Sequence, residues 1–147
     1  MTTDQPAAEP VRLLDQDGID ELLRTSRRIA VVGASSNPTR PSLAVFRTLQ
    51  AHGYECIPVN PNETEVAGAP AVATLAEAAQ SGPIDIVDVF RRPEATEEIA
   101  REAVAIGARA LWLQLGVINW ESARIAAEGG LAVVMDRCPA IELATLG

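Results

Sequence analysis

The sequence of 147 residues contains no lysine, so its basic side chains are arginines and a single histidine. Two kinds of site depend on lysine: enzymes that form a Schiff base through a lysine amine, and Walker-type phosphate loops, in which a lysine reaches the phosphates. A genome of high GC content would also explain the missing lysine. Whatever its cause, the absence of lysine excludes both kinds of site.

Histidine and cysteine are also scarce. The only histidine, His52, precedes Gly53 near the expected end of a helix, where a structural or solvated histidine suits the helix C-terminus. Cys56 and Cys138 are too few and too far apart for a disulfide framework, and the chain has no cysteine pair at metal-binding spacing. We therefore predict no bound metal.

Long apolar runs are missing as well, since none approaches the ~20 residues that a membrane helix needs. Residues 1–10 lack the basic start and apolar stretch of a signal peptide, so we expect a mobile tail there and one domain over residues 11–147. The formal net charge of −8 argues against extended nucleic-acid binding. We expect a soluble cytoplasmic protein that binds neither nucleic acid nor membranes.

Five apolar segments alternate with helical patterns along the chain. Several segments are apolar at consecutive positions, which indicates a parallel sheet covered on both faces. We predict a three-layer α/β fold, a Rossmann-like doubly wound parallel sheet of five strands in the order 3-2-1-4-5. Ligands bind such sheets at the carboxyl ends of the strands, where the order reverses, here between strands 1 and 4. The expected strands are 29–32, 54–59, 84–90, 110–115 and 131–135, and the expected helices are 16–26, 42–51, 74–80, 93–106 and 119–128.

A loop of small residues follows the first expected strand. A glycine and two serines let the backbone approach a bulky group, and the helix that follows directs its unpaired N–H groups to the same place. This arrangement predicts a phosphorylated ligand. The loop residues are Gly33, Ala34, Ser35, Ser36, Asn37, Pro38, Thr39 and Arg40.

Arginines gather at the same expected edge. Arg40 lies in the loop, and Arg91 and Arg92 follow the third strand. Together with a helix N-terminus they would hold a pyrophosphate at about −8 kcal/mol, which corresponds to micromolar affinity. The alternative is that these arginines are solvated or pair with nearby glutamates such as Glu94.

The loop does not fit a dinucleotide fingerprint. It has one glycine in place of Gly-x-Gly-x-x-Gly, and the second strand ends in Val59, Asn60 and Pro61 with no acid to bind a ribose. Ser35 and Ser36 have no histidine or lysine expected nearby to act as a base. Asp136 is expected to orient a loop, and Cys138 is either a quiet structural thiol or one that reacts with a ligand thiol.

Five ordered blocks of sequence resemble the small bacterial CoA-binding protein family. The members are stand-alone Rossmann-like domains similar to the N-terminal domain of the succinyl-CoA synthetase alpha subunit. The blocks lie at residues 32–38, 59–61, 85–93, 111–117 and 134–139. The resemblance implies CoA as the ligand, with its 3′-phospho-ADP portion on the loop of Gly33, Ala34, Ser35 and Pro38. It also implies contacts from Asn60, Pro61, Val89, Phe90, Arg91, Leu115 and Gly116.

The chain departs from the family pattern at two positions, where Leu43 replaces a frequent aromatic residue and Ala140 a frequent lysine. The synthetase uses a phosphorylated histidine in a second domain, which has no counterpart in this chain, so ligase activity is not carried over. We expect a protein that binds CoA or an acyl-CoA without a catalytic step of its own. The alternatives are an enzyme that uses a nicotinamide or flavin nucleotide, and a regulatory subunit of a partner enzyme.

Overall fold

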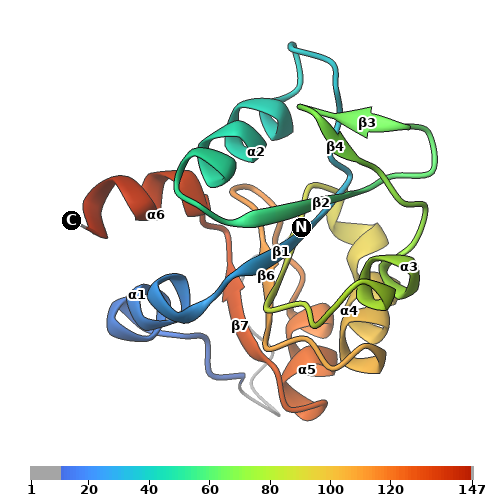
Figure 1. Cartoon of the computed structure of the whole chain (residues 1–147). Helices are drawn as coiled ribbons and strands as arrows, with labels where there is room; N and C mark the ends of the chain where they lie inside the picture. The colour runs from blue at the N-terminus through green and yellow to red at the C-terminus, as the bar shows by residue number, and fades with distance from the viewer. Residues whose placement is uncertain (1–10, 147) are drawn as a thin grey trace.

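A parallel sheet of five strands forms the middle layer of the computed structural model, which describes residues 11–146 (Figure 1). Nearly every position of these strands is buried, as a sheet covered on both faces requires. The strands are β1 (Arg28–Val32), β2 (Glu55–Val59), β5 (Ile86–Val89), β6 (Ala110–Leu113) and β7 (Ala132–Met135).

Three helices cover each face of the sheet (Figure 1). The first face carries α1 (Gln16–Thr25), α2 (Pro41–Ala51) and α6 (Pro139–Leu146). The second carries α3 (Leu75–Gln80), α4 (Thr96–Ala105) and α5 (Trp120–Glu128). Side chains that alternate along each strand divide between the two cores, so Trp112 of β6 packs in the first and its neighbour Leu111 in the second. The fold class predicted from the sequence is confirmed.

The predicted strand order is wrong in the position of the third strand. β1 pairs with both β2 and β5, so the strands, numbered as the sequence analysis expected them, lie in the order 2-1-3-4-5 instead of 3-2-1-4-5. Pro58 gives the physical reason, because a proline has no N–H for a ladder and is tolerated at a sheet edge. The order of the sheet therefore reverses between β1 and β5, and not between the first and fourth strands.

A short hairpin that the sequence analysis did not predict lies beyond this edge. Its strands, β3 (Glu65–Val66) and β4 (Ala69–Pro70), pair with each other. The chain then returns along β2, where the N–H of Val72 donates to the carbonyl of Pro58 at 2.9 Å. The outer edge of β2, where Pro58 lies, is thus partly covered by the segment around Val72.

The helix boundaries follow local capping chemistry. Thr74 and Asn119 accept hydrogen bonds from the N–H groups of Glu77 and Ser122, which confirms both expected caps. Pro93 begins a 3₁₀ turn, η1 (Pro93–Ala95), and α4 starts only at Thr96, so the helix predicted from Pro93 is shorter than expected. The expected tail of residues 1–10 lies outside the described residues. Between residues 11 and 146, no helix has the length and apolar character to span a bilayer.

Candidate functional site

A cavity of about 620 Å³ opens at the carboxyl edge of the sheet, where the sequence analysis expected the ligand. We call it the edge cavity. It is bordered by the loop after β1, the ends of β2, β5 and β6, and the start of α6. Seven of the expected site residues line it: Gly33, Ser35, Arg40, Asn60, Phe90, Arg91 and Leu115.

Gly33 brings the loop close to the neighbouring strand. Its φ of +86° is unfavourable for residues with a side chain, and a Cβ at this position would lie 2.4 Å from the carbonyl oxygen of Phe90. Its N–H donates to the carbonyl of Val59 at 2.9 Å. The loop after β1 is therefore wedged between β2 and β5 in a conformation that glycine accommodates without strain.

The loop is held by side chains that surround it. The amide nitrogen of Asn60 donates to the carbonyl of Ala34 at 3.0 Å, and the hydroxyl of Ser42 accepts from the N–H of Ser35 at 3.2 Å. Asn60, predicted as a ligand contact, thus also supports the loop from below. These bonds fix the backbone that borders the edge cavity.

A carboxylate lies on the outer side of the loop. Glu63 accepts hydrogen bonds from the N–H and the hydroxyl of Ser36, at 3.0 and 2.8 Å. These bonds, led by the one from the Ser36 N–H, lower the pKa of Glu63 below its usual value. The loop therefore already binds one anionic group through its own N–H and O–H donors.

Two of the three expected arginines line the edge cavity. Arg40 precedes α2 and Arg91 follows β5, and neither forms an ion pair with any other described residue. Arg92 is exposed and its Nε lies 3.6 Å from the carboxylate of Glu94, the alternative that the sequence left open. Two unpaired guanidinium groups thus remain for an anionic ligand.

Six of the expected site residues do not line the edge cavity. Ala34 and Val89 are buried in the two cores, whereas Ser36, Pro38, Pro61 and Gly116 are exposed around it. The N–H of Gly116 donates to the carboxylate of Asp136 at 2.7 Å, so Asp136 orients this turn as expected. Ligand contacts by these six residues stay predictions.

The edge cavity also contains residues that the sequence analysis did not assign to the ligand. Gln114, directly after β6, is buried and its Oε1 has no hydrogen-bond partner among the described residues. Its signal in the sequence was a lone amide in an otherwise apolar run. Cys138 and Ile141 border the cavity from the start of α6. Cys138 and Cys56 are both free thiols.

Burial raises the pKa of two groups that lie within strands, Asp88 and Cys56. Asp88, in the middle of β5, is fully buried, and burial raises its pKa well above the usual range. It does not line the edge cavity. Burial, followed by the charges of Asp88 and Glu55, raises the pKa of Cys56 to about 12. Within residues 11–146, no cluster of three or more histidine, cysteine or acidic side chains is placed to hold a metal ion.

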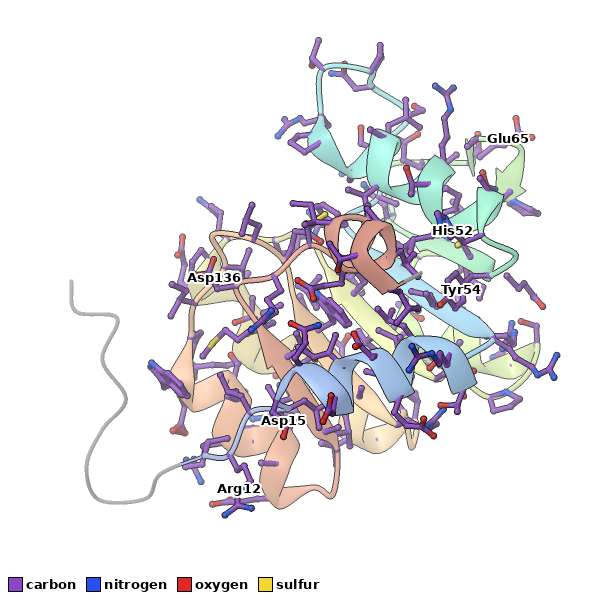
Figure 2. The ribbon with its side chains drawn as sticks, turned by 90° about the vertical axis from the view of Figure 1, so that its left-hand side faces the viewer. Arg12, Asp15, His52, Tyr54, Glu65 and Asp136 are labelled. Atoms are coloured by element: carbon purple, nitrogen blue, oxygen red, sulfur yellow. The ribbon has the colours of Figure 1, made fainter. Side chains whose placement is uncertain are left out.

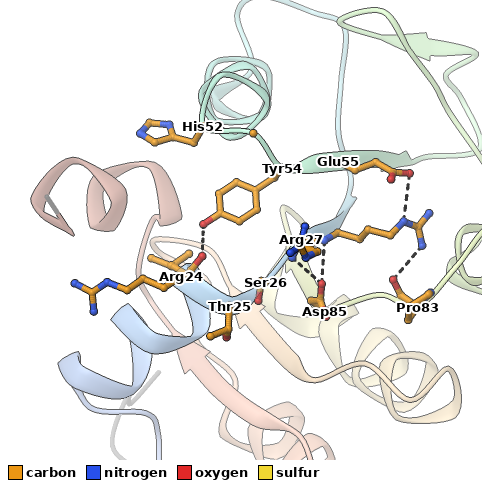
Figure 3. A pocket seen from close by; sticks show the side chains of 12 residues that line it. Arg24, Thr25, Ser26, Arg27, His52, Tyr54, Glu55, Pro83 and Asp85 are labelled. Atoms are coloured by element: carbon orange, nitrogen blue, oxygen red, sulfur yellow. Dashed lines mark hydrogen bonds and ion pairs between the residues drawn. The ribbon is translucent and has the colours of Figure 1, made fainter.

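A larger cavity of about 910 Å³ lies at the opposite, amino edge of the sheet (Figure 3). Figure 2 shows His52 and Tyr54 on that side and Asp136 on the other. The polar groups of this cavity hold the structure together. The hydroxyl of Tyr54 donates to the carbonyl of Leu23, and Asp85 accepts from the N–H groups of Arg27 and Arg28.

The other charged groups of the amino edge are only partly engaged, because the guanidinium groups of Arg24 and Arg27 line this cavity without an ion-pair partner among the described residues. Arg28 pairs with Glu55 at 3.2 Å and donates to the carbonyl of Pro83. His52 is exposed at the end of α2, with its Nδ1 2.9 Å from the carbonyl of Thr48, which confirms the structural or solvated role expected for it. The edge cavity remains the candidate site because ligands bind such sheets at the carboxyl ends of the strands, whereas this larger cavity lies at the amino ends.

Comparison with known proteins places the chain in a family. A family model described as a CoA binding domain matches residues 27–144. An uncharacterized protein of Bacillus subtilis, YneT, is 46% identical over 120 residues, which are 82% of this chain and 87% of that protein. A hypothetical protein from Pyrococcus horikoshii has a structure with a TM-score of 0.86 and 35% identity, covering 94% of this chain and 98% of its own.

The same fold occurs within a much longer enzyme. A dinucleotide-forming acetyl-coenzyme A synthetase of Ca. Korarchaeum cryptofilum matches with a TM-score of 0.67 and 20% identity, over 86% of this chain and 31% of the enzyme. At this identity the likeness shows the fold alone. The match of the family model over most of the chain shows more: this protein belongs to the CoA-binding domain family.

Proposed function

We propose that the protein binds CoA or an acyl-CoA in the edge cavity and has no catalytic step of its own. The observation that carries the proposal is the position of Arg40 and Arg91, which border the cavity at the carboxyl edge of the sheet and have no ion-pair partner in the described part of the chain. The family match supports the choice of CoA among phosphorylated ligands.

The two ends of the cavity differ in chemistry. Ser35 and Arg40 follow β1 and Arg91 follows the neighbouring β5, so we assign these residues to a polar end, which suits the 3′-phospho-ADP portion of CoA. Leu115, Val117 and Ile141 supply apolar surface, which suits the pantetheine arm. This polarity gives CoA one preferred direction in the cavity.

Calorimetric titration of three arginine variants with CoA tests the proposal. Arg40→Ala and Arg91→Ala should each weaken binding roughly 10-fold or more, because a hydrogen bond to a charged group contributes about 1.5–3 kcal/mol. Arg92→Ala is the matched control, since this neighbour pairs with Glu94 outside the cavity, and its affinity should stay within about two-fold. Equal losses in all three variants would refute the assignment of the polar end.

Nicotinamide and flavin nucleotides provide the comparison for the enzymatic alternative. The end of β2 offers an amide at Asn60 and no acid for a ribose, so NAD and FAD should not displace CoA at equal concentration. Tighter binding of NAD or FAD than of CoA would favour the alternative.

A further inference from the structure

Cys138 lies between two cavities. Besides the edge cavity it borders an adjoining cavity of about 430 Å³, and Leu115 and Ile141 are shared by both in the same way. These two side chains, 58% and 55% exposed, are the exposed large hydrophobic residues of the described chain. The thiol therefore lies beside the apolar side chains of Leu115 and Ile141, which also belong to the apolar end of the proposed CoA site.

The loop that carries Cys138 is fixed in place. The indole N–H of the buried Trp112 donates to the carbonyl of Arg137 at 2.8 Å. Asp136 adopts a φ of +60°, uncommon for a residue with a side chain, while its carboxylate accepts from the N–H of Gly116. These contacts hold the thiol at the cavity wall, although the residue itself is only 7% exposed.

A second feature of the same wall indicates that a polar ligand group belongs there. Gln114 is 7% exposed, borders the edge cavity with Cys138, and leaves its side-chain oxygen without a partner among residues 11–146. A buried amide oxygen without a hydrogen bond costs free energy, and a donor on a ligand would remove that cost. The pantetheine arm of CoA carries amide N–H groups of this kind.

We propose that Cys138 captures CoA covalently by thiol–disulfide exchange with CoA disulfide, a step that rests on the proposed function. The thiolate of Cys138 attacks one sulfur of the disulfide, the S–S bond of the reagent breaks, and one CoA leaves as its thiolate and takes up a proton. The product is a mixed disulfide between Cys138 and the CoA that stays in the cavity. One disulfide is consumed and one is formed, so no further oxidant is needed.

The geometry favours this thiol over the other one. Arg91 and Cys138 follow β5 and β7, two strand positions apart, or roughly 10 Å at the spacing of a sheet. A CoA whose phosphates lie on the arginines would thus bring its sulfur to this wall at a high effective concentration. Cys56 lies in β2 at the far edge of the sheet, about 19 Å from β7, and does not border the edge cavity.

Intact-mass spectrometry of the reduced full-length chain after incubation with CoA disulfide tests the proposal. One CoA adduct should form on the wild type and on Cys56→Ser, and proteolytic mapping should place it on Cys138. Cys138→Ser should form none. Hydroxyethyl disulfide, which lacks the nucleotide, should react at least 10-fold more slowly with the wild type, and Arg91→Ala should reduce this preference whereas Arg92→Ala should not.

The outcomes separate the two proposals. Calorimetric CoA binding without an adduct would overturn the covalent step and leave the proposed function standing. An adduct mapped to Cys56, or equal rates with both disulfides in the wild type, would also overturn it, because either result shows reaction without guidance from the site. Mapping and the comparison of disulfides both use wild-type protein, so they decide the question even if Cys138→Ser does not fold.

Discussion

Gly33 shows how one backbone position shapes the site. Replacing it by alanine forces a residue with a Cβ into the left-handed backbone conformation, which costs about 1–2 kcal/mol of stability. The replacement also places this Cβ against the carbonyl of Phe90. Gly68, with a φ of +82° and open space around it, isolates the first cost. We expect Gly33→Ala to lower the free energy of unfolding in urea by more than Gly68→Ala. Equal losses would mean that the close approach to Phe90 is relieved at no cost.

Glu63 is a charge that the proposed ligand must accommodate. Its carboxylate accepts both donors of Ser36 on the loop after β1. Glu63→Gln keeps the shape and removes a negative charge near the CoA phosphates, so CoA should bind roughly 2- to 5-fold more tightly, the size expected for exposed charge pairs. Glu128→Gln, on α5 where it pairs with Arg124, is the control and should leave the affinity unchanged. Weaker binding by Glu63→Gln would show that the carboxylate supports the site instead.

Asp88 makes the stability depend on pH. Its pKa is raised by burial, so the folded protein keeps a proton that the unfolded chain loses near pH 3.9. The stabilisation is complete below about pH 3.9 and is lost as the pH rises through the folded pKa. The urea stability of Asp88→Asn should therefore rise relative to wild type between about pH 5 and pH 8. A difference between Asp88→Asn and wild type that stays constant across this pH range would contradict this account.

At the scale of elements, the side chain of Asn119 connects the start of α5 to η1. Its Oδ1 accepts from the N–H of Ser122 at 3.0 Å, and its Nδ2 donates to the carbonyl of Pro93 at 2.9 Å. Asn119→Ala should cost about 2 kcal/mol of unfolding free energy, a helix cap plus one further hydrogen bond. Thr74→Ala, which removes the exposed cap of α3, should cost only about 1 kcal/mol in the same urea titration. Equal costs would show that the bond to Pro93 contributes nothing.

The elements were predictable where their sequence pattern is long and periodic. The five strands and five of the helices follow from apolar runs and capping residues. The strand order did not follow, because local pattern says nothing of which strands pair. Pro58 was the available signal, since a proline belongs at a sheet edge. The hairpin of β3 and β4 has strands of two residues each, too short for a periodicity, and α6 was not among the expected helices.

At the scale of the whole molecule, parallel strands explain why the site was partly predictable. Their carboxyl ends meet at one edge, so residues 60, 91 and 115, far apart in sequence, line one cavity in the structure. Tertiary contacts decide which of these side chains are already paired within the protein and which are left to bind a ligand. The sequence did not show that Arg92 pairs with Glu94, that Asn60 supports the loop, or that Gln114 lacks a partner.

Calorimetric titration of the full-length wild-type protein with CoA tests the central claim most directly. The account predicts saturable binding in the micromolar range, about −8 kcal/mol, and weaker binding of dephospho-CoA, which lacks the 3′-phosphate. Absence of any heat of binding at millimolar CoA would contradict it.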